Sequence, residues 1–290
     1  MSENYEQVLV KRLQTEIENE LDRLGLLFRV FSRAKSSSSI NHKIESKGEG
    51  YYSVDGKKIQ DLFGIRIALY FPDDIKIARQ ALKKMYPLIS EEVDSHDASL
   101  FEAIRCNFVF KLPDSIVSDS QIIRTNELVD STFEVQLRTI LSEGWHEVEH
   151  DLRYKCKSDW DNHNDLSRAL NGIYATLETS DWGMMRLFED LTYRHYKAQE
   201  WAPMLRNKFR LRTGNDLEPS LKLIMDQDDI GKRLYRLNRR KLIITILNKG
   251  IRVPININTL VYIANYYFIK DSRISDITPR ALSRILDELD

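Results

Sequence analysis

Basic residues near the start of the sequence have types and spacings that suit a polyphosphate. Arg33 and Lys35 lie two positions apart in a stretch that predicts a strand, so their side chains leave the same face. Ser39 and Lys43 follow after a serine run, in a stretch that predicts a helix. A guanidinium group binds phosphate oxygens in pairs, and an ammonium group acts as a point charge. These residues therefore predict a phosphate-binding site, although basic residues beside serines are also common on ordinary protein surfaces.

Carboxylates occur in two other predicted strands. Asp61 stands at the entrance of a largely apolar strand, and Glu134 lies in an alternating stretch in which Gln136 and Arg138 share its face. A row of carboxylate, amide and guanidinium groups is costly to bury unless an anion or a metal ion lies opposite. Asp61 and Glu134 could together hold Mg²⁺, which binds one or two carboxylates along with phosphate oxygens and water. The alternative is a sheet face that is exposed to solvent.

A predicted helix contains a match to the H-E-x-x-H motif of zinc proteases. His146 and His150 lie four positions apart and would share one face of that helix. Against this interpretation, Glu149 places a charge where such helices usually bury an apolar residue. Arg153 stands where one large branch of zinc proteases has glycine. A zinc protease is therefore a minor alternative.

The composition excludes several classes of protein. The 290 residues are 42% hydrophobic and 30% charged, with a net charge of −1. Eleven Gly and seven Pro exclude collagen-like chains, and four Trp with thirteen Tyr argue against wholesale disorder. Cys106 and Cys156 could form at most one disulfide, and neither belongs to a C-x-x-C pair, so no cysteine zinc cage is expected. The first residues are acidic and polar, and no apolar run approaches the ~18 residues of a membrane span. We expect a soluble, cytoplasmic protein without a membrane segment.

The apolar pattern predicts helices and strands that alternate through the first half of the chain. Apolar residues three or four positions apart between Leu9 and Leu24 predict an opening helix. Strands are predicted at 26–35, 62–71, 106–112 and 131–137, and helices at 73–85 and from the last strand to residue 155. Beyond Asp165 only helices are predicted. This order indicates an α+β fold in which a mixed sheet packs between helices, followed by an all-helical C-terminal extension.

Charge is unevenly distributed along the chain. Residues 204–252 contain thirteen Lys and Arg against five Asp and Glu. Such a block indicates either an anionic partner or a solvated helix face. We expect one domain over residues 1–212 and a small helical domain over residues 213–290 that serves interaction or oligomerisation.

Three motifs together resemble the synthetase domain of RelA/SpoT-type enzymes. Residues 133–155 contain E-V-Q-L-R-T followed by W, E-H and L-x-Y-K, as in the signature of that family. The family's R-x-K-x-x-x-S-x-x-x-K donor loop is matched by Arg33, Lys35, Ser39 and Lys43. Its D-(I/L)-x-G-x-R strand is matched by residues 61–66. The resemblance extends in order and spacing over about residues 9–155.

RelA/SpoT-type enzymes transfer pyrophosphate from ATP to the ribose 3′-hydroxyl of GDP or GTP and so make (p)ppGpp alarmones. The resemblance implies a nucleotidyltransferase-like mixed sheet and a magnesium-dependent GTP pyrophosphokinase of the stringent response. The ATP-binding residues that it implies are Arg33, Lys35, Ser39, Lys43 and Arg66. Asp61 and Glu134 would be catalytic and hold Mg²⁺, and Glu134 would also accept the proton of the attacking hydroxyl. The remaining pocket residues that it implies are Gln136, Arg138 and His150.

The acceptor loop departs from the family pattern G-Y-(R/Q)-(S/A)-(I/L)-H. Ile104 stands at the place of the tyrosine that stacks on guanine, Arg105 keeps the arginine, and Phe108 takes the place of the histidine. This loop therefore leaves the identity of the acceptor molecule undecided. One alternative is pyrophosphorylation of the tRNA 3′ end, as in toxic small alarmone synthetases that are paired with an antitoxin. Another is a non-catalytic descendant that binds a nucleotide or RNA.

The basic segment 204–252 has two interpretations under this resemblance. With a tRNA acceptor, its cations would contact RNA phosphates and Tyr235 would offer a stacking ring. Alternatively, the helical C-terminal region builds a homo-oligomer, as small synthetases of this family often do.

Overall fold

Two compact units make up the computed structural model, which describes residues 2–48, 50–93, 106–214, 216–227 and 229–290. The first unit contains the chain up to Asn19 together with Phe28–Glu178. The second contains Glu20–Leu27 and Thr179–Asp290. Helices α1 (Ser2–Arg23) and α7 (Asn164–Lys197) contribute residues to both. The division therefore falls within α7, upstream of the boundary expected after residue 212.

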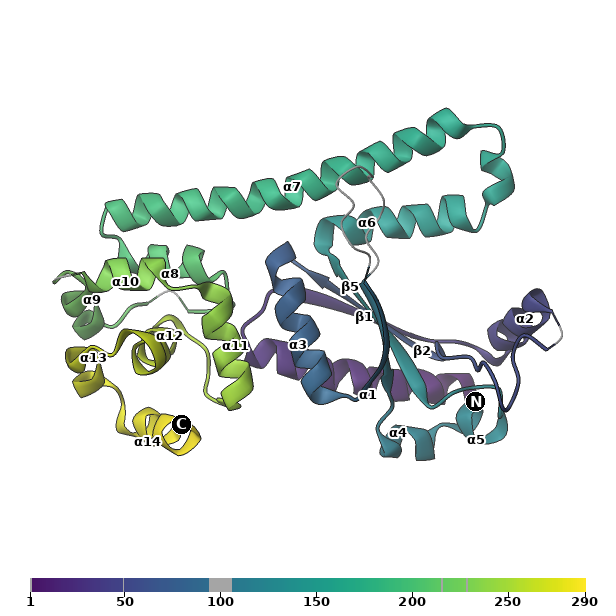
Figure 1. The fold of residues 1–290 in the computed structure, drawn as a ribbon, viewed down its shortest axis with the longest axis horizontal. Coiled ribbons are helices and arrows are strands. Elements are labelled where there is room, and N and C mark those ends of the chain that lie inside the picture. The colour runs from purple at the N-terminus through teal and green to yellow at the C-terminus, as the bar shows by residue number, and fades with distance from the viewer. Residues whose placement is uncertain (1, 49, 94–105, 215, 228) are drawn as a thin grey trace. The chain divides into compact units, whose positions relative to one another are not determined.

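A mixed five-stranded sheet forms the centre of the first unit (Figure 1). Its strands are β1 (Phe28–Ala34), β2 (Phe63–Leu69), β3 (Leu88–Val93), β4 (Cys106–Lys111) and β5 (Thr132–Thr139). They lie in the order β1-β2-β5-β4-β3. β2 and β5 are parallel, and the other neighbouring strands are antiparallel. Because side chains alternate between the two faces, the strand sequences give this sheet one buried apolar face and one polar face.

Helices α1 and α3 (Ile75–Met85) pack on the apolar face of the sheet. From α1, Gln14 accepts a hydrogen bond from the Ser32 hydroxyl of β1 at 2.7 Å. Tyr86, which ends α3, packs edge-to-face on Phe133 of β5 with ring centroids 5.1 Å apart. The Tyr86 hydroxyl donates to Glu16 at 3.0 Å. Both helices are thus tied to the sheet and to each other.

Shorter helices connect the strands of the first unit or follow the last of them. They are α2 (Ser37–Lys47), α4 (Asp114–Asp119), α5 (Gln121–Thr125) and α6 (Ile140–Glu149), with 3-10 turns at Pro72–Asp74 and Lys157–Trp160 and a π-helical turn at His150–Tyr154. The Ser36 hydroxyl accepts from the Ser39 amide at the start of α2, at 3.1 Å. The Thr139 hydroxyl accepts from the Ser142 amide at the start of α6, at 3.2 Å. Such caps satisfy backbone N–H groups that the helix leaves unpaired, and they fix where each helix begins.

The second unit is helical in its described residues. Besides the end of α7 it contains α8 (Trp201–Phe209), α9 (Pro219–Met225), α10 (Ile230–Arg236), α11 (Arg239–Lys249), α12 (Ile257–Ala264), a π-helical turn (Asn265–Ile269), α13 (Ser272–Ile277) and α14 (Arg280–Leu289). Its core is apolar and includes Leu242, Ile246 and Leu260, which are at most 1% exposed. Among the described helices of the chain, none is both long enough and apolar enough to cross a membrane.

Several residues of the basic segment 204–252 are engaged inside the second unit. Arg239 is buried, and its Nε donates to the Phe209 carbonyl at 2.5 Å. Arg233 donates to the carbonyl of Ile269. Tyr235 stacks on Tyr196, with ring centroids 4.6 Å apart. These side chains therefore help to build the unit, which reduces the basic and aromatic surface that an RNA could contact.

The expected fold class is confirmed, since a mixed sheet flanked by helices is followed by a helical C-terminal region. All four expected strands are present within a few residues of their expected bounds. The sequence pattern does not predict β3, because this edge strand has mostly exposed side chains and consecutive glutamates. The helix expected to reach residue 155 ends at Glu149 and continues as a π-helical turn.

Candidate active site

The polar face of the sheet brings many of the expected site residues together. Arg33 of β1, Gly64 of β2 and Glu134 of β5 are register partners in one row across the sheet. Arg66 and Gln136 are partners in the next row, two positions along. Because Gly64 has no side chain, none stands between Arg33 and Glu134 in the first row. A pocket of about 160 Å³ opens over these strands.

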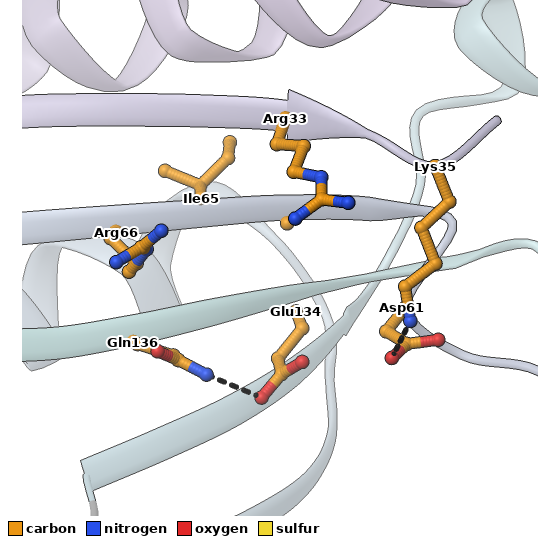
Figure 2. Close-up of a pocket in the computed structure, with 8 residues that line it drawn as sticks. Arg33, Lys35, Asp61, Ile65, Arg66, Glu134 and Gln136 are labelled. Atoms are coloured by element: carbon orange, nitrogen blue, oxygen red, sulfur yellow. Dashed lines mark hydrogen bonds and ion pairs between the residues drawn. The ribbon is translucent and has the colours of Figure 1, made fainter. Parts of the chain in front are cut away.

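The pocket combines cations with carboxylates (Figure 2). The residues that line it are Arg33, Lys35, Asp61, Gly64, Ile65, Arg66, Glu134 and Gln136. They belong to β1, β2 and β5 or lie directly beside these strands. Three cations suit the oxygens of a polyphosphate, and two carboxylates suit a hard divalent cation that accompanies it.

Two lysines hold Asp61 at the edge of this pocket. Lys43 Nζ lies 2.8 Å from Asp61 Oδ1 and 2.7 Å from Oδ2, and Lys35 Nζ donates to Oδ2. Burial would raise the pKa of Asp61, but hydrogen bonds from Lys35 and Lys43 outweigh burial and hold it below its ordinary value. Burial would lower the pKa of Lys43, yet Asp61 raises it above the ordinary value. At Lys35 burial dominates and lowers the pKa.

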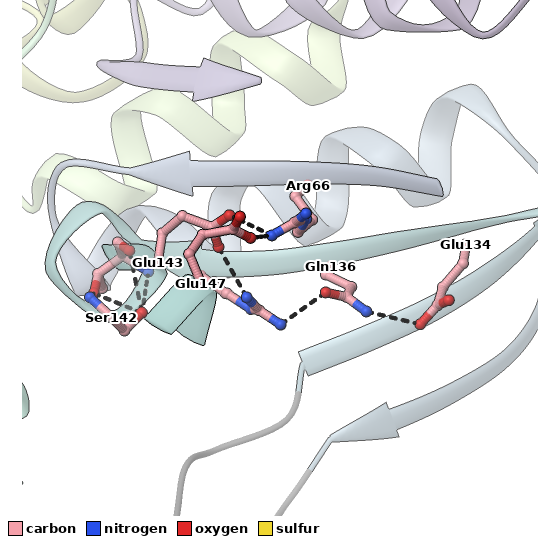
Figure 3. Close-up of polar contacts among 8 residues, drawn as sticks. Arg66, Glu134, Gln136, Ser142, Glu143 and Glu147 are labelled. Carbon is pink, nitrogen blue, oxygen red and sulfur yellow. Dashed lines mark hydrogen bonds and ion pairs between the residues drawn. The ribbon is translucent and has the colours of Figure 1, made fainter. Parts of the chain in front are cut away.

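A chain of hydrogen bonds runs from Glu134 along β5 to helix α6 (Figure 3). Gln136 Nε2 donates to Glu134 Oε1 at 3.0 Å, and Arg138 Nη2 donates to Gln136 Oε1 at 2.8 Å. Arg138 Nη1 then donates to Glu143 Oε2 at 2.9 Å. Arg66 Nη1 donates to the other oxygen of Glu143, also at 2.9 Å. Four expected site residues are thus linked through one carboxylate that no sequence motif singles out.

Helix α6 supplies Glu143 and a second carboxylate, Glu147, to Arg66. The Glu143 side chain is 8% exposed, whereas that of Glu147 is 51% exposed. The signal that could have found them is their four-residue spacing in a helix that begins directly after the polar strand. Such a helix turns one face back over that strand, and glutamates on it can meet the strand's arginines.

Ser39 and His150 are not among the residues that line the pocket. Ser39 lies in the first turn of α2, where its hydroxyl is 2.8 Å from the Ser36 hydroxyl. His150 begins the π-helical turn after α6, and its half-exposed ring has Nδ1 2.9 Å from Asp151 Oδ1. Of the expected donor loop, Arg33 and Lys35 line the pocket and Lys43 reaches it through Asp61.

The expected acceptor loop is described in part. Ile104 and Arg105 lie outside the described residues. Phe108 lies on β4 with a fully buried side chain, stacked on Phe110 with ring centroids 6.0 Å apart. It therefore packs in the core and does not face the pocket, contrary to the expectation. Because side chains alternate along a strand, Asn107 takes the polar face instead, in register with Gln136.

The two histidines of the H-E-x-x-H match have separate surroundings. His146 packs against Trp145 and Tyr174, with ring centroids 5.2 and 5.7 Å away. Burial and two neighbouring arginines lower the pKa of His146 to about 3. His150 lies beyond the end of α6 and is half exposed. Within the described ranges, no group of three or more His, Cys, Asp and Glu side chains is placed to hold a metal ion, as a zinc protease would require.

Comparison with known protein families identifies the region that carries the pocket. Residues 32–159 match the family model described as the region found in RelA/SpoT proteins. This part of the chain is therefore similar to RelA/SpoT proteins. This region contains all eight residues that line the pocket, together with Lys43 and Glu143. The resemblance inferred from the three sequence motifs is thereby confirmed.

The chain is also similar to individual proteins. The GTP pyrophosphokinase YjbM of Bacillus subtilis (strain 168) is 26% identical over 152 residues, which cover 51% of this chain and 66% of that relative. The chain thus spans just under two thirds of the curated relative. The crystal structure of small alarmone synthetase 2 from Bacillus subtilis is 21% identical, with 63% of this chain and 94% of that chain covered and a TM-score of 0.47. Small alarmone synthetase 1 from Bacillus subtilis, bound to its product pppGpp, is 20% identical, with 63% and 92% covered and a TM-score of 0.45.

Proposed function

We propose that this chain is a magnesium-dependent pyrophosphokinase that transfers pyrophosphate from ATP to the ribose 3′-hydroxyl of a guanine nucleotide, which makes a (p)ppGpp-type alarmone. One observation carries the proposal: the pocket of the RelA/SpoT region unites the cations of β1 and β2 with Asp61 and Glu134. Phosphoryl-group transfer depends mainly on positioning and on neutralising the charge of the phosphates. The cations and carboxylates of the pocket are residue types that can position the phosphates and neutralise their charge.

The reaction exchanges one phosphorus–oxygen bond for another. The 3′-oxygen of the acceptor attacks the β-phosphorus of ATP and forms a bond to it. The bond from the β-phosphorus to the oxygen shared with the α-phosphate breaks, and AMP leaves with the electron pair. The proton of the hydroxyl passes to a base on the protein.

The donor loop binds the phosphates of ATP through an exchange of ion-pair partners. In the protein alone, Lys35 and Lys43 are paired with Asp61. On binding of ATP, the two ammonium groups would turn to phosphate oxygens, which would leave the Asp61 carboxylate free to hold a magnesium ion. Each charge that loses a partner gains another, so the exchange avoids leaving a partly buried ion uncompensated.

Asp61 and Glu134 fit a magnesium ion. Both line the pocket, and the Asp61 side chain is 24% exposed while it pairs with Lys35 and Lys43. Mg²⁺ prefers oxygen ligands and commonly binds one or two carboxylates together with substrate phosphates. When bound, the ion would help to neutralise the charge of the transferred group.

Glu134 is the base that we assign to the acceptor hydroxyl. Its Oε1 accepts a hydrogen bond from Gln136, which restricts the direction of the carboxylate. A general base must reach the proton that it removes, and Glu134 lies in the same pocket as the cations that hold the donor.

A guanine nucleotide is the acceptor favoured over tRNA. Arg233, Tyr235 and Arg239 are engaged within the second unit, which weakens the case for an RNA-binding surface on the basic segment. A descendant that binds without turnover is also disfavoured, because the pocket keeps both carboxylates that the reaction needs.

A transfer assay tests this proposal. The full chain is incubated with γ-labelled ATP and magnesium, with GDP, GTP, ATP or deacylated tRNA offered separately. We expect label on GDP or GTP, and no label with Asp61→Ala or Glu134→Ala. Label on tRNA alone would overturn the guanine acceptor in favour of a translation-stopping toxin. No label on any acceptor would overturn the activity in favour of a binding protein.

A further inference from the structure

Glu143 lies at the centre of the polar network, although it is not part of the pocket wall. Its side chain is 8% exposed, and each carboxylate oxygen serves a different arginine. Oε1 accepts from Arg66 of β2, and Oε2 accepts from Arg138 of β5, both at 2.9 Å. A buried carboxylate that joins two neighbouring strands in this way fixes the positions of both guanidinium groups (Figure 3).

The two arginines need an anion between them. Burial lowers the pKa of Arg138, Glu143 opposes this effect, and the nearby charge of Arg66 lowers the pKa further. Because both guanidinium groups donate to the same carboxylate at 2.9 Å, Arg66 and Arg138 lie close enough to repel each other. Without Glu143, we expect this repulsion to move them apart and to change what each contacts.

Glu143 also determines the orientation of the Gln136 amide. Arg138 can only donate hydrogen bonds, so its Nη2 requires the oxygen end of Gln136. The nitrogen end of that amide is then directed to Glu134, to which it donates. The carboxylate of Glu143 thus acts through one intervening side chain, Arg138, on Gln136, the group that holds Glu134.

The location of Glu143 is itself fixed by the start of α6. Thr139 and Ser142 form reciprocal side-chain and backbone hydrogen bonds, so the helix begins at a defined residue. Glu143 follows directly and points back to β2 and β5. Glu147, one turn later, contacts Arg66 from a largely exposed position. Glu143 is buried and contacts both Arg66 and Arg138, whereas Glu147 is half exposed. Glu143 is therefore the glutamate that is suited to hold both guanidinium groups in position.

We propose that Glu143 is a positioning residue of this site. It holds Arg66 for the ATP phosphates and, through Arg138 and Gln136, orients the Glu134 carboxylate toward the acceptor hydroxyl. This inference rests on the proposed function. It adds a residue that touches neither substrate and acts through residues that do.

Three variants of the full chain test the proposal. Glu143→Gln keeps the size of the side chain but presents an NH₂ group to one of the two arginines, whereas Glu143→Asp keeps the charge. Glu91→Gln is the matched control, because Glu91 also bridges two cations, Arg79 and Lys83, outside the pocket. For each variant, kcat and KM for ATP and GTP, the binding of a non-hydrolysable ATP analogue with magnesium, and the midpoint of thermal unfolding are measured.

We expect Glu143→Gln to lower kcat by ~10–100-fold, as is usual when a residue that orients a reactive group is removed. The ATP analogue binds more weakly, Glu143→Asp recovers part of the loss, and Glu91→Gln stays within ~2-fold of the wild type. If Glu143→Gln does not fold, kcat and ATP-analogue binding of Glu143→Asp are compared with those of Glu91→Gln instead.

Two outcomes would overturn the positioning role. One is a Glu143→Gln variant with kcat equal to that of Glu91→Gln. The other is tighter binding of the ATP analogue, because removal of a negative charge beside phosphate-binding cations strengthens binding unless position matters more. If the wild type binds the analogue but transfers no pyrophosphate, the proposed function fails, and the binding comparison still decides the role of Glu143.

Discussion

Lys43 and Asp61 form a two-point ion pair, with the ammonium nitrogen 2.7 and 2.8 Å from the two carboxylate oxygens. Lys43 comes from α2, and Asp61 lies just before β2, so the pair ties the donor loop to the sheet. Lys35, directly after β1, donates to the same carboxylate. The loop is therefore held at the pocket by the charges that we expect to bind substrate and metal.

Replacement of Asp61 by Asn should separate ATP binding from turnover. The two lysines lose the carboxylate that competes with phosphate, so we expect the variant to bind an ATP analogue more tightly than the wild type when magnesium is absent. With magnesium present, its turnover should be lost, because a ligand for the cation is missing. Calorimetry with and without magnesium measures the first effect. Weaker binding without magnesium would contradict the exchange of partners.

The same variant should also change how stability depends on pH. The pKa of Asp61 in the folded protein lies below its ordinary value of 3.8, so its ion pairs stabilise the fold fully above that value. This contribution is lost as pH falls below 3.8 through the folded pKa. We expect Asp61→Asn to lower the free energy of unfolding by about 1–2 kcal/mol at pH 7, and the difference to shrink near pH 3. Urea denaturation at the two pH values measures this, and a constant difference would count against the ion pairs.

Glu134→Gln should stop the chemical step while leaving donor binding in place. The amide keeps the size of the side chain but cannot accept the proton of the acceptor hydroxyl. We expect kcat to fall by ~10²–10⁴-fold, the usual contribution of a general base. The affinity for an ATP analogue should change much less. A variant with near-normal kcat would show that another group removes the proton.

Gly64 provides a steric test of the pocket. A Cβ added at Gly64 would meet its nearest heavy atom, the Arg33 carbonyl oxygen, at an ordinary 3.9 Å. Gly64→Ala should therefore fold normally and bind nucleotide nearly as the wild type does. Gly64→Leu places its side chain between Arg33 and Glu134, and it should abolish nucleotide binding with little change in thermal unfolding. Unimpaired binding by the leucine variant would place the nucleotide elsewhere.

The sequence predicted the fold class and most of the pocket because the signals were local. Arg33, Lys35 and Glu134 lie on strands whose alternation fixes the face of each side chain. Glu143 could not be found in this way, since its role depends on how α6 folds back over β2 and β5. The misplacement of Phe108 has a different origin, because it depends on which face of β4 the residue occupies. A shift of one position along a strand reverses the face, and the structure directs Asn107 to the polar side.

His146 should contribute a pH-dependent loss of stability. Burial, Arg138 and Arg66 lower its pKa from 6.5 to about 3, so the folded protein keeps it neutral where the unfolded chain binds a proton. The folded state is therefore favoured fully above pH 6.5 and loses stability as pH falls toward 3.

We expect the wild type to lose about 1.4 kcal/mol more unfolding free energy than His146→Gln between pH 7.5 and 5.5. Chemical denaturation of both proteins at these two pH values provides the measurement. An equal loss in the two proteins would show that His146 titrates normally.

The most direct test of the central claim is the fate of the β-phosphate of ATP. The full chain is given β-labelled ATP, magnesium and GTP, and the products are separated by chromatography. Our account predicts unlabelled AMP and a guanine nucleotide that carries the label, because the β- and γ-phosphates move together. Labelled ADP, which would mean that the γ-phosphate moved alone, would contradict it.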